Sequence, residues 1–442
     1  MLSLENLLAT FRQHGATRLF AKRLSPNDNS KNQIYLGGDF SALGLIPHGP
    51  VVTDDAELAG SVRDRAKAPL RFCWHTEDGF QRAPHAQLIL YPKYPEVRLS
   101  GLLKGCRGAP GDVLRVRDEG RVLVLGARPD GVVFGFAAAS GHPVAQEINA
   151  MALPETLGVF ILLSAYGTAA PDTRGALIAK LRQIHLEGWI PSQKLGVDGV
   201  GRPYAARNGG GYTLEARLGV TPNGYAEPDY LGWEVKQYGV ANLAKPVAKS
   251  PVTLMTPEPS GGFYRTDGPA AFVRRFGYAD KSGKADRINF GGIYVAGRAA
   301  HGDTGLRFDI AGYNASTGKI EDMGGALALV TADGEAAAAW SFASLIDHWN
   351  RKHARAVYVP SVRRDAPPAY AYGAAVTLCE NTDFLKFVQA AAAGAVYLDP
   401  ALKLEKAGSA KPVLKCRNQF RIRQPAVAQL YEKCGITDVT AE

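Results

Sequence analysis

Asp229, Glu234 and Lys236 stand close together in the run EPDYLGWEVK, residues 227–236, whose other residues after Glu227 are apolar or aromatic. On a β-strand, Glu234 and Lys236 project from the same face, because side chains two positions apart point the same way. Gly232 permits a bend that places the carboxylate of Asp229 beside them. Two carboxylates at one point favour a hard divalent cation such as Mg²⁺, and a neighbouring lysine can orient or help to deprotonate a water. These three side chains are suited to the hydrolysis of phosphodiester bonds. The alternative interpretation is that the run is an exposed edge strand on which Glu234 and Lys236 form a surface salt bridge.

A third carboxylate lies just upstream, in GGGYTLEARLG, residues 209–219. This run predicts a short helix that is entered through a glycine turn and carries Glu215. A glutamate in that place can contact the metal-bound water from the opposite side.

The run GGGYTLEARLGVTPNGYAEPDYLGWEVKQY resembles the MvaI/BcnI family of restriction endonucleases, a MutH-like branch of the PD-(D/E)xK nucleases. SPVTLMTPEPSGG (250–262) and HWNRKHARAVYVP (348–360) resemble it too, so the resemblance spans residues 172–435. It implies the fold of the PD-(D/E)xK nucleases and the activity of a Mg²⁺-dependent endonuclease. The catalytic residues that it implies are Glu215, Asp229, Glu234 and Lys236, with Asp229 and Glu234 as the metal ligands.

A second distinctive run is AKRLSPNDNSKNQIYLGG, residues 21–38, which reads as two strands around a polar loop. Such a loop is either simply solvated or suited to base edges and phosphates. The run resembles the opening of the EcoRII N-terminal effector domain, a DNA-binding pseudobarrel that grips the major groove with two arms. The resemblance implies an N-arm near residues 25–33 and a C-arm at residues 91–101. The DNA-binding candidates are Lys22, Arg23, Ser25, Asn27, Lys31, Asn32, Gln33, Lys93, Glu96 and Arg98.

The C-terminal run KPVLKCRNQFRIRQ, residues 411–424, alternates basic and apolar residues. A solvated edge strand is one interpretation of this pattern. The family resemblance implies another, in which Arg417, Asn418 and Arg421 contact the DNA site.

The run GVDGVGRPYAARNGGG, residues 196–211, is rich in glycine. It lacks the GK[ST] signature of a phosphate-binding loop, so it does not indicate a nucleotide site.

The elements expected around these residues define an α+β protein. Residues 1–150 predict short strands separated by turns, as in a β-rich barrel or pseudobarrel, and residues 151–442 predict an α/β nuclease domain. The expected strands of the first part lie at residues 33–38, 70–75, 86–92, 113–117, 121–127 and 132–138. The main expected helices lie near the N-terminus and at residues 157–167, 172–186, 214–219, 341–353 and 381–394.

Composition limits the class of protein. The 442 residues carry a formal net charge of +9 with 46% hydrophobic residues, which fits a folded protein with a local basic patch. The five cysteines are scattered without a CxxC pair, so we expect neither a disulfide framework nor a zinc site, and a reducing cytoplasmic location. No apolar run is long enough to span a membrane, and no signal peptide is evident.

Together these patterns predict a sequence-specific type II restriction endonuclease that cuts double-stranded DNA, with a CCWGG-like site implied by both resemblances. We expect a monomer whose N-terminal domain is an effector or specificity element, and a cognate cytosine methyltransferase that acts on the same site. One alternative is a MutH-like nicking endonuclease in repair. Another is a DNA-binding regulator that keeps the nuclease fold as a scaffold, although the intact Glu215, Asp229, Glu234 and Lys236 argue against it.

Overall fold

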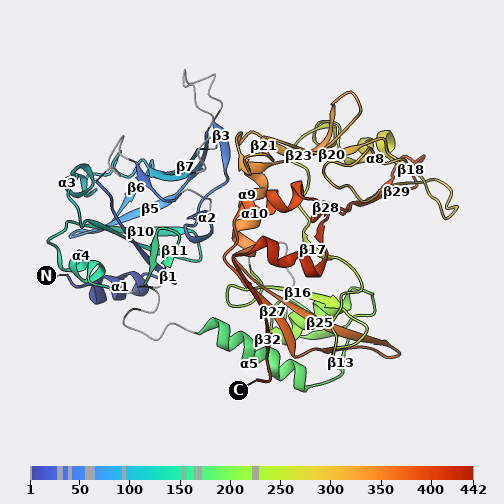
Figure 1. Ribbon diagram of the computed structural model, residues 1–442, viewed down its shortest axis with the longest axis horizontal. Helices are drawn as coiled ribbons and strands as arrows, with labels where there is room; N and C mark the ends of the chain where they lie inside the picture. The colour runs from blue at the N-terminus through green and yellow to red at the C-terminus, as the bar shows by residue number, and fades with distance from the viewer. Residues whose placement is uncertain are drawn as a thin grey trace. The chain divides into compact units, whose positions relative to one another are not determined.

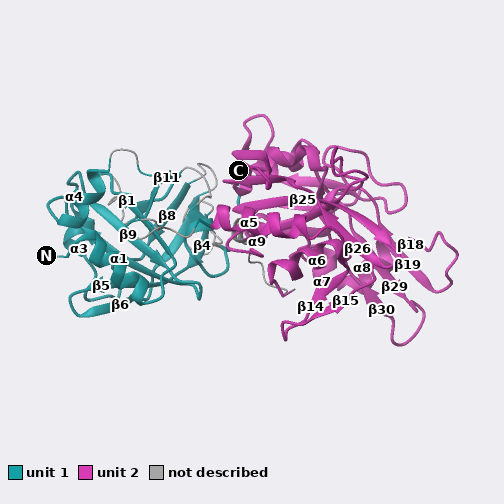
Figure 2. Cartoon of the chain, turned by 90° about the horizontal axis from the view of Figure 1, so that it is seen from below, with its two compact units in different colours: residues 1–172, 320–323 teal, residues 173–319, 324–442 magenta. Residues whose placement is uncertain are grey.

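The chain forms two compact units, which Figure 2 shows in different colours. The computed structural model describes residues 2–26, 33–37, 42–54, 65–91, 96–151, 154, 156–163, 166, 172–221 and 228–441. Unit 1 comprises residues 1–172 and 320–323, and unit 2 comprises residues 173–319 and 324–442. The predicted α+β class is confirmed, since helices and strands are mixed along the chain.

Unit 1 is built on two β-sheets (Figure 1). The first has seven strands in the order β11 (Thr156–Leu157), β12 (Phe160–Leu162), β1 (Arg18–Arg23), β9 (Val122–Ala127), β10 (Val132–Ala138), β5 (Arg71–Thr76) and β6 (Gly79–Ala83). The second has five strands in the order β2 (Ile34–Tyr35), β8 (Glu96–Ser100), β7 (Gln87–Tyr91), β4 (Arg65–Pro69) and β3 (Val52–Asp54).

Four helices complete the described part of unit 1: α1 (Leu4–Gln13), α2 (Ala42–Leu45), α3 (Gly111–Arg115) and α4 (Pro143–Asn149). The expected N-terminal amphipathic helix is confirmed as α1, where the Ser3 side chain accepts a hydrogen bond from the backbone of Asn6. Its buried side chains follow the helical repeat and join the core of the first sheet: Leu4, Leu7, Leu8 and Phe11.

Two expectations for this part of the chain are wrong. Residues 157–167 do not form a buried helix, because the described part of this run forms β12, which pairs with β1. Residues 113–117 lie largely in helix α3 instead of a strand. In both cases a short apolar run fits a helix and a strand equally well, and tertiary pairing decides. Since β11 and β12 belong to the first sheet, unit 1 extends to Asp172 and not only to residue 150.

The sheet that carries the predicted catalytic residues is centred on β25 (Arg355–Asp365) in unit 2. Strand β16 (Glu234–Gly239) pairs with β25 in parallel, while β26 and β27 pair with successive halves of β25 in antiparallel fashion. The remaining strands are β13 (Ile190–Pro191), β26 (Pro368–Tyr372), β27 (Ala375–Glu380) and β32 (Lys433–Asp438). Helices α5 (Thr173–Leu186) and α6 (Gly209–Leu218) supply apolar residues to the core of this sheet.

Smaller sheets form the rest of unit 2. They are β14 (Gln193–Leu195) with β15 (Gly201–Pro203); β17 (Val252–Met255), β31 (Phe420–Ile422) and β28 (Val396–Leu398); β18 (Tyr278–Ala279), β19 (Arg287–Gly291), β29 (Ala401–Glu405) and β30 (Val413–Lys415); β20 (Arg307–Ala311), β23 (Ala326–Val330) and β24 (Ala336–Ser341); and β21 (Tyr313–Asn314) with β22 (Lys319–Ile320). The further helices are α7 (Phe263–Thr266), α8 (Pro269–Phe276), α9 (Phe342–His353), α10 (Phe384–Ala392) and the 3₁₀ helix η3 (Gln424–Leu430). The expected helices at 341–353 and 381–394 are thus confirmed as α9 and α10.

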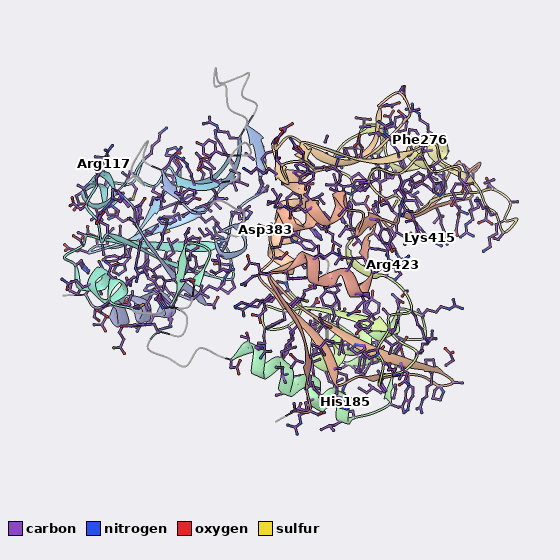
Figure 3. All side chains as sticks on the ribbon, in the orientation of Figure 1. Arg117, His185, Phe276, Asp383, Lys415 and Arg423 are labelled. Carbon is purple, nitrogen blue, oxygen red and sulfur yellow. A yellow bond between two sulfur atoms is a disulfide. The ribbon has the colours of Figure 1, made fainter. Side chains whose placement is uncertain are left out.

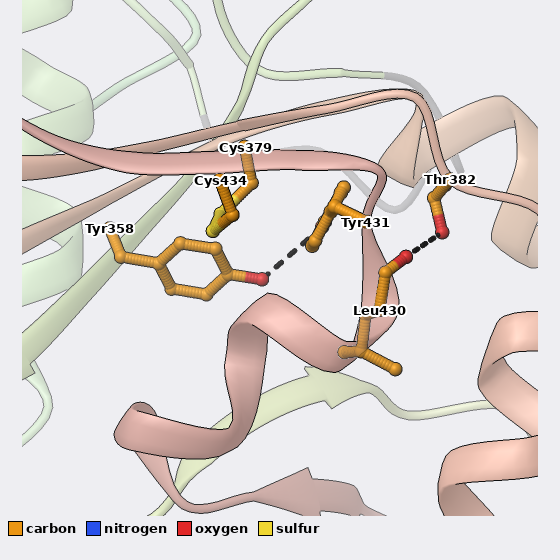
Figure 4. Close-up of a disulfide and its surroundings, with 6 residues drawn as sticks. All are labelled: Tyr358, Cys379, Thr382, Leu430, Tyr431 and Cys434. Atoms are coloured by element: carbon orange, nitrogen blue, oxygen red, sulfur yellow. Dashed lines mark hydrogen bonds between the residues drawn. A yellow bond between two sulfur atoms is a disulfide. The ribbon is translucent and has the colours of Figure 1, made fainter.

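The cysteines differ from expectation at one place. Cys379 and Cys434 form a disulfide between β27 and β32 (Figure 4). The two residues are directly opposite each other in the antiparallel register, with Cα atoms 4.1 Å apart, although 55 residues separate them in sequence. Cross-strand proximity of this kind leaves no spacing signal in the sequence, which is why the pairing was not predicted.

Among the described residues, no helix combines the length and apolarity that crossing a bilayer would require.

Candidate active site

Helix α6 positions Glu215, and its glycine-rich start lets it approach the sheet closely. A Cβ atom on Gly210 would lie 2.8 Å from the side-chain oxygen of Gln237 in β16, and one on Gly209 would lie 2.5 Å from Oγ of Ser192. The hydroxyl of Tyr372 donates a hydrogen bond to the carbonyl of Gly210 at 2.7 Å. The glycines therefore bring the helix, and Glu215 with it, against the strand that carries the other charged residues.

Strand β16 places Glu234 and Lys236 on one face, as predicted, with Val235 buried between them. The side chain of Glu234 is only 1% exposed and that of Lys236 is 19% exposed, and the two form an ion pair. The parallel register sets Glu234 opposite Ala356 and Lys236 opposite Tyr358 of β25. A carboxylate this deeply buried is expensive to ionise without a countercharge.

Asp229 reaches the same place through a tight turn. Leu231 and Gly232 both have positive φ, 50° and 82°, and Tyr230 and Trp233 exchange backbone hydrogen bonds across the turn. Oδ2 of Asp229 accepts a hydrogen bond of 2.9 Å from the backbone nitrogen of Val235. The bend expected at Gly232 is confirmed, and it fixes the Asp229 carboxylate at the start of β16.

The carboxyl groups strongly affect one another. Burial raises the pKa of Glu215 to about 7, and the negative charge of Asp229 acts in the same direction. Burial also raises the pKa of Glu234 to about 7, against the opposing effect of the Lys236 ammonium. Burial disfavours the charge of Lys236 itself, but Glu234, Asp229 and Glu215 outweigh that effect and raise its pKa. The site thus concentrates negative charge that a cation would stabilise.

A second lysine, which the sequence interpretation missed, contacts the same carboxylate. Nζ of Lys352, near the end of α9, lies 3.4 Å from Oε1 of Glu234, and its side chain is 21% exposed. Next to it, His353 is fully buried, and its Nε2 lies 3.1 Å from the carbonyl oxygen of Leu254. Burial lowers the pKa of His353 well below its ordinary value, and the nearby lysines reinforce this. The run HWNRKH lies in a segment that resembles the family, but this resemblance implies no role for its lysine.

The donor set suits a hard divalent cation. Both carboxylate oxygens of Glu234 are buried, and the ammonium groups of Lys236 and Lys352 form ion pairs with this carboxylate. Asp229 adds a second carboxylate that is fixed by the backbone. Within the described part of the chain, however, no three His, Cys, Asp or Glu side chains are arranged to hold a metal ion. Two carboxylates with water completing the shell is the arrangement that Mg²⁺ favours, so these residues fit such an ion.

In unit 1 the structure brings three of the predicted DNA-contacting residues together. Nε of Arg98 donates a hydrogen bond of 3.0 Å to Glu96, and its Nη1 lies 3.4 Å from the side-chain oxygen of Gln33. The hydroxyl of Tyr91 lies 3.4 Å from the same oxygen, and the Arg98 guanidinium lies over the Tyr91 ring. This polar cluster joins strands β7 and β8 to Gln33, which directly precedes β2. Asn27, Lys31, Asn32 and Lys93 lie outside the described residues.

Three other predicted contacts in unit 1 belong to its framework. Lys22 is only 4% exposed, which argues against the predicted contact with DNA phosphates. Arg23 donates hydrogen bonds to the carbonyls of Ile148 and Met151, at and just beyond the end of α4. The carbonyl of Ser25 accepts a hydrogen bond from the buried Arg121.

At the C-terminal end, two of the three predicted contacts are built into the fold. Arg421, in β31, donates to Asp399 at 2.6 Å and to the carbonyl of Pro251 at 2.8 Å. Asn418 is 3% exposed, whereas Arg417 is exposed. Burial therefore leaves Arg417 as the residue of this group that is most accessible to a ligand.

The comparisons with known proteins concern the segment that contains this site. The model of the MvaI/BcnI restriction endonuclease family matches residues 178–431. No curated protein matches the chain. The solved structure of the MvaI restriction endonuclease in complex with cognate DNA is 17% identical, with a TM-score of 0.45, over 60% of this chain and 98% of that one. The structure of MvaI without DNA is 15% identical, with a TM-score of 0.34, over 60% of this chain and 97% of that one.

Proposed function

The chain belongs to the MvaI/BcnI restriction endonuclease family, and from that premise we propose that it is a type II restriction endonuclease that uses Mg²⁺ to hydrolyse DNA at a defined sequence. The observation that carries this proposal is the buried Glu234 carboxylate, held between Lys236 and Lys352 on the family-matched segment. Asp229 and Glu215 lie within electrostatic reach of the same group. A structural salt bridge would not need three carboxylates around one lysine.

In the proposed mechanism, Asp229 and Glu234 hold the divalent cation. When bound, the cation stabilises negative charge on the scissile phosphate and lowers the pKa of a coordinated water. Lys236 stays protonated at neutral pH, because the surrounding carboxylates raise its pKa. It therefore acts as a hydrogen-bond donor that orients the attacking water and stabilises charge on the phosphate oxygens. Glu215, whose pKa is raised to about 7, can hold or release a proton near neutral pH.

The finer parts of the proposal rest on the sequence resemblances. They are a CCWGG-like site, unit 1 as an EcoRII-like pseudobarrel with an effector or specificity role, a monomeric cytoplasmic enzyme, and a cognate cytosine methyltransferase as its partner in the cell. The polar cluster of Gln33, Glu96 and Arg98 in unit 1 supports a DNA-contacting role there, since arginine and amide side chains are the common readers of base edges.

The decisive experiment is cleavage of supercoiled plasmids by the full-length protein with and without Mg²⁺, followed by sequencing of the ends. The proposal requires cuts at one short sequence, dependence on the divalent cation, and protection of sites that carry methylated cytosine. A monomer by light scattering should give a nicked circle before linear product, and a short specific duplex added in trans should change the rate. Cleavage at random positions would overturn sequence specificity. A dimer that linearises plasmid without a nicked intermediate would overturn the monomer.

A further inference from the structure

The glycine-rich run that carries no nucleotide site forms a projecting hairpin. Strands β14 and β15 pair in antiparallel register, with Lys194 opposite Arg202, and residues 196–200 make the turn. The hairpin, residues 193–203, stands out from unit 2 in Figure 2. The turn is shaped by its glycines: Gly199 has a φ of +74°, and a Cβ atom on Gly196 would lie 1.8 Å from the Arg202 guanidinium. Glycine is thus favoured at position 199, where the turn reverses with positive φ, and Gly196 leaves room for the Arg202 side chain to fold over the turn.

The turn of this hairpin is fixed before any ligand arrives. Both terminal nitrogens of Arg202 donate to the Asp198 carboxylate, at 2.9 and 2.7 Å. Oδ1 of Asp198 also accepts from the backbone nitrogen of Val200, and the Gly196 nitrogen donates to the Val200 carbonyl. These bonds hold the turn in one shape, which reduces the entropy lost on binding.

The tip of the hairpin is apolar and fully in solvent. Val197 is 96% exposed and Val200 is 55% exposed. A single exposed valine is unremarkable on a protein surface. Here, however, two valines occupy the apex of a turn whose one charged side chain, Asp198, is occupied by Arg202. The tip can therefore make an apolar contact with a ligand, but its side chains have few free groups that could form hydrogen bonds with one.

The base of the hairpin is fastened to helix α6. Oγ1 of Thr213, which is fully buried, accepts a hydrogen bond from the Gln193 nitrogen at 3.0 Å and lies 3.3 Å from the Gln193 carbonyl. The Lys194 ammonium lies 4.7 Å from the ring centre of Tyr212. The same helix carries Glu215, two residues after Thr213. The hairpin and one carboxylate of the candidate active site are therefore parts of a single rigid piece.

The charge near the hairpin is complementary to a polyanion. Residues 193–208 carry Lys194, Arg202 and Arg207 against one acidic residue, Asp198. Extended strand rises about 3.3 Å per residue, so the tip reaches about 13–17 Å from its base, roughly four or five base-pair steps. If Glu215 serves a scissile phosphate, a tip at this reach is close enough to contact a duplex bound at the same site.

We propose that the 193–203 hairpin is a wedge that distorts the DNA beside the cut, with Val197 packing against bases and Lys194 lying along the phosphates. The proposal rests on the endonuclease function given above. An apolar side chain at the tip of an arm can part a base step from the minor-groove side, at the cost of stacking energy that additional protein contacts recover. Because the tip has no free side chain that could hydrogen-bond to base edges, it would favour DNA sequences that are easily deformed at this step.

The test uses full-length protein and cognate duplexes that carry 2-aminopurine at successive positions near the cut, without divalent cation. Wild-type protein should raise the fluorescence at one step, because unstacking relieves quenching. Val197→Ser should abolish that rise and weaken binding about tenfold, the loss expected when the burial of a valine is removed. Val197→Leu should retain both. Ile436→Ser, which changes a residue that is 76% exposed on β32, is the matched control and should leave both unchanged.

The possible failures are distinguishable. If wild-type protein cuts its site while Val197→Ser gives normal fluorescence and affinity, the wedge is overturned and the endonuclease stands. If Val197→Ser dissociates an oligomer in light scattering and leaves DNA binding unchanged, the tip is a protein contact and the wedge is again overturned. If wild-type protein cuts no duplex with any divalent cation, the proposed function fails and the wedge fails with it.

Discussion

Nζ of Lys352 lies 3.4 Å from Oε1 of Glu234, the carboxylate that also receives the ammonium group of Lys236. Two cations on one carboxylate that is 1% exposed show how much countercharge this position needs. The second cation comes from helix α9, so the charge balance of β16 depends on an element far away in the sequence.

This arrangement makes a prediction for Lys352→Met. Without divalent cation at pH 8, the variant should lower Tm by about 2–4 °C, because Glu234 loses part of its countercharge. Saturating Mg²⁺ should remove most of the difference, since the ion supplies the missing charge. Lys352→Arg should behave like wild type. If calorimetry shows that Lys352→Met lowers Tm equally with and without Mg²⁺, the substitution disturbs packing and not the charge balance of Glu234.

The second prediction concerns the catalytic residues. Asp229→Ala, Glu234→Ala and Lys236→Ala should each abolish Mg²⁺-dependent plasmid cleavage, because they hold the ion or orient the water. Specific DNA binding in gel-shift assays should remain, since these groups do not read bases. Glu215→Ala should be milder. Near wild-type cleavage by any of the first three variants would show that the active site is assigned incorrectly.

A third prediction follows from the raised pKa values of Glu215 and Glu234, both about 7. Between pH 4.5 and 7 these two groups bind more protons in the folded state than in the unfolded state, so their contribution to the free energy of unfolding falls as pH rises through this window. The lowered pKa of His353 acts in the opposite direction, so the prediction concerns the difference in Tm between wild type and Glu234→Gln in metal-free protein. In thermal scans wild type should lose Tm relative to Glu234→Gln as pH rises through this range, and Mg²⁺ should restore the Tm of wild type above pH 7. A difference in Tm that stays constant across the window would contradict the pKa shift of Glu234.

The fourth prediction concerns Arg98 in unit 1. Arg98→Ala should reduce the difference in affinity between specific and random duplexes by about 1–3 kcal/mol, the value of one good base contact. The full-length chain is the appropriate protein, because β12 completes the sheet beyond residue 150. Arg128→Ala is the control: Arg128 pairs with Asp130 at 2.9 Å in the same unit but outside the polar cluster. Equal effects of both variants in a competition assay would exclude base reading by Arg98.

A fifth prediction separates structure from recognition at Arg421. Its guanidinium joins Asp399 and the carbonyl of Pro251, and the Arg421 side chain is only 22% exposed. Arg421→Ala should therefore lower the free energy of unfolding by about 2–3 kcal/mol in urea titrations, and Asp399→Ala should do about the same. Arg423→Ala should change it by less than about 0.5 kcal/mol, because Arg423, which is labelled in Figure 3, is an exposed residue. If Arg421→Ala keeps full stability and loses specificity, the earlier sequence interpretation was correct.

The local parts of the candidate site could be predicted from sequence because their cause is local. The alternation of Glu234, Val235 and Lys236 indicates a strand, and Gly232 indicates the turn that returns Asp229. The helix expected at residues 341–353 corresponds to α9, in which the Ser341 side chain caps the first turn. Each signal lies within a few residues of the feature that it predicts.

The remaining features depend on contacts between distant segments. Lys352 meets Glu234 only because α9 leads into β25, the strand that pairs with β16. The Cys379–Cys434 pair depends on the register of β27 with β32. Burial of Lys22 and Asn418 likewise comes from tertiary packing, so polar residues that suited a DNA contact by type lie inside the fold.

The pairing of β16 with β25 also sets an order of events during synthesis. Residues 234–239 leave the ribosome well before residues 356–361, their partners, and β32 follows later still. Long-range pairing of this kind is slow, because the chain loses the entropy of closing a long loop before the stabilising contacts between the strands can form. An incomplete chain carries the four charged side chains without the strand that fixes them. If the chain cuts DNA as proposed, a product that ends before β25 lacks the strand that positions Glu234 and Lys236, and we expect it to cut no DNA.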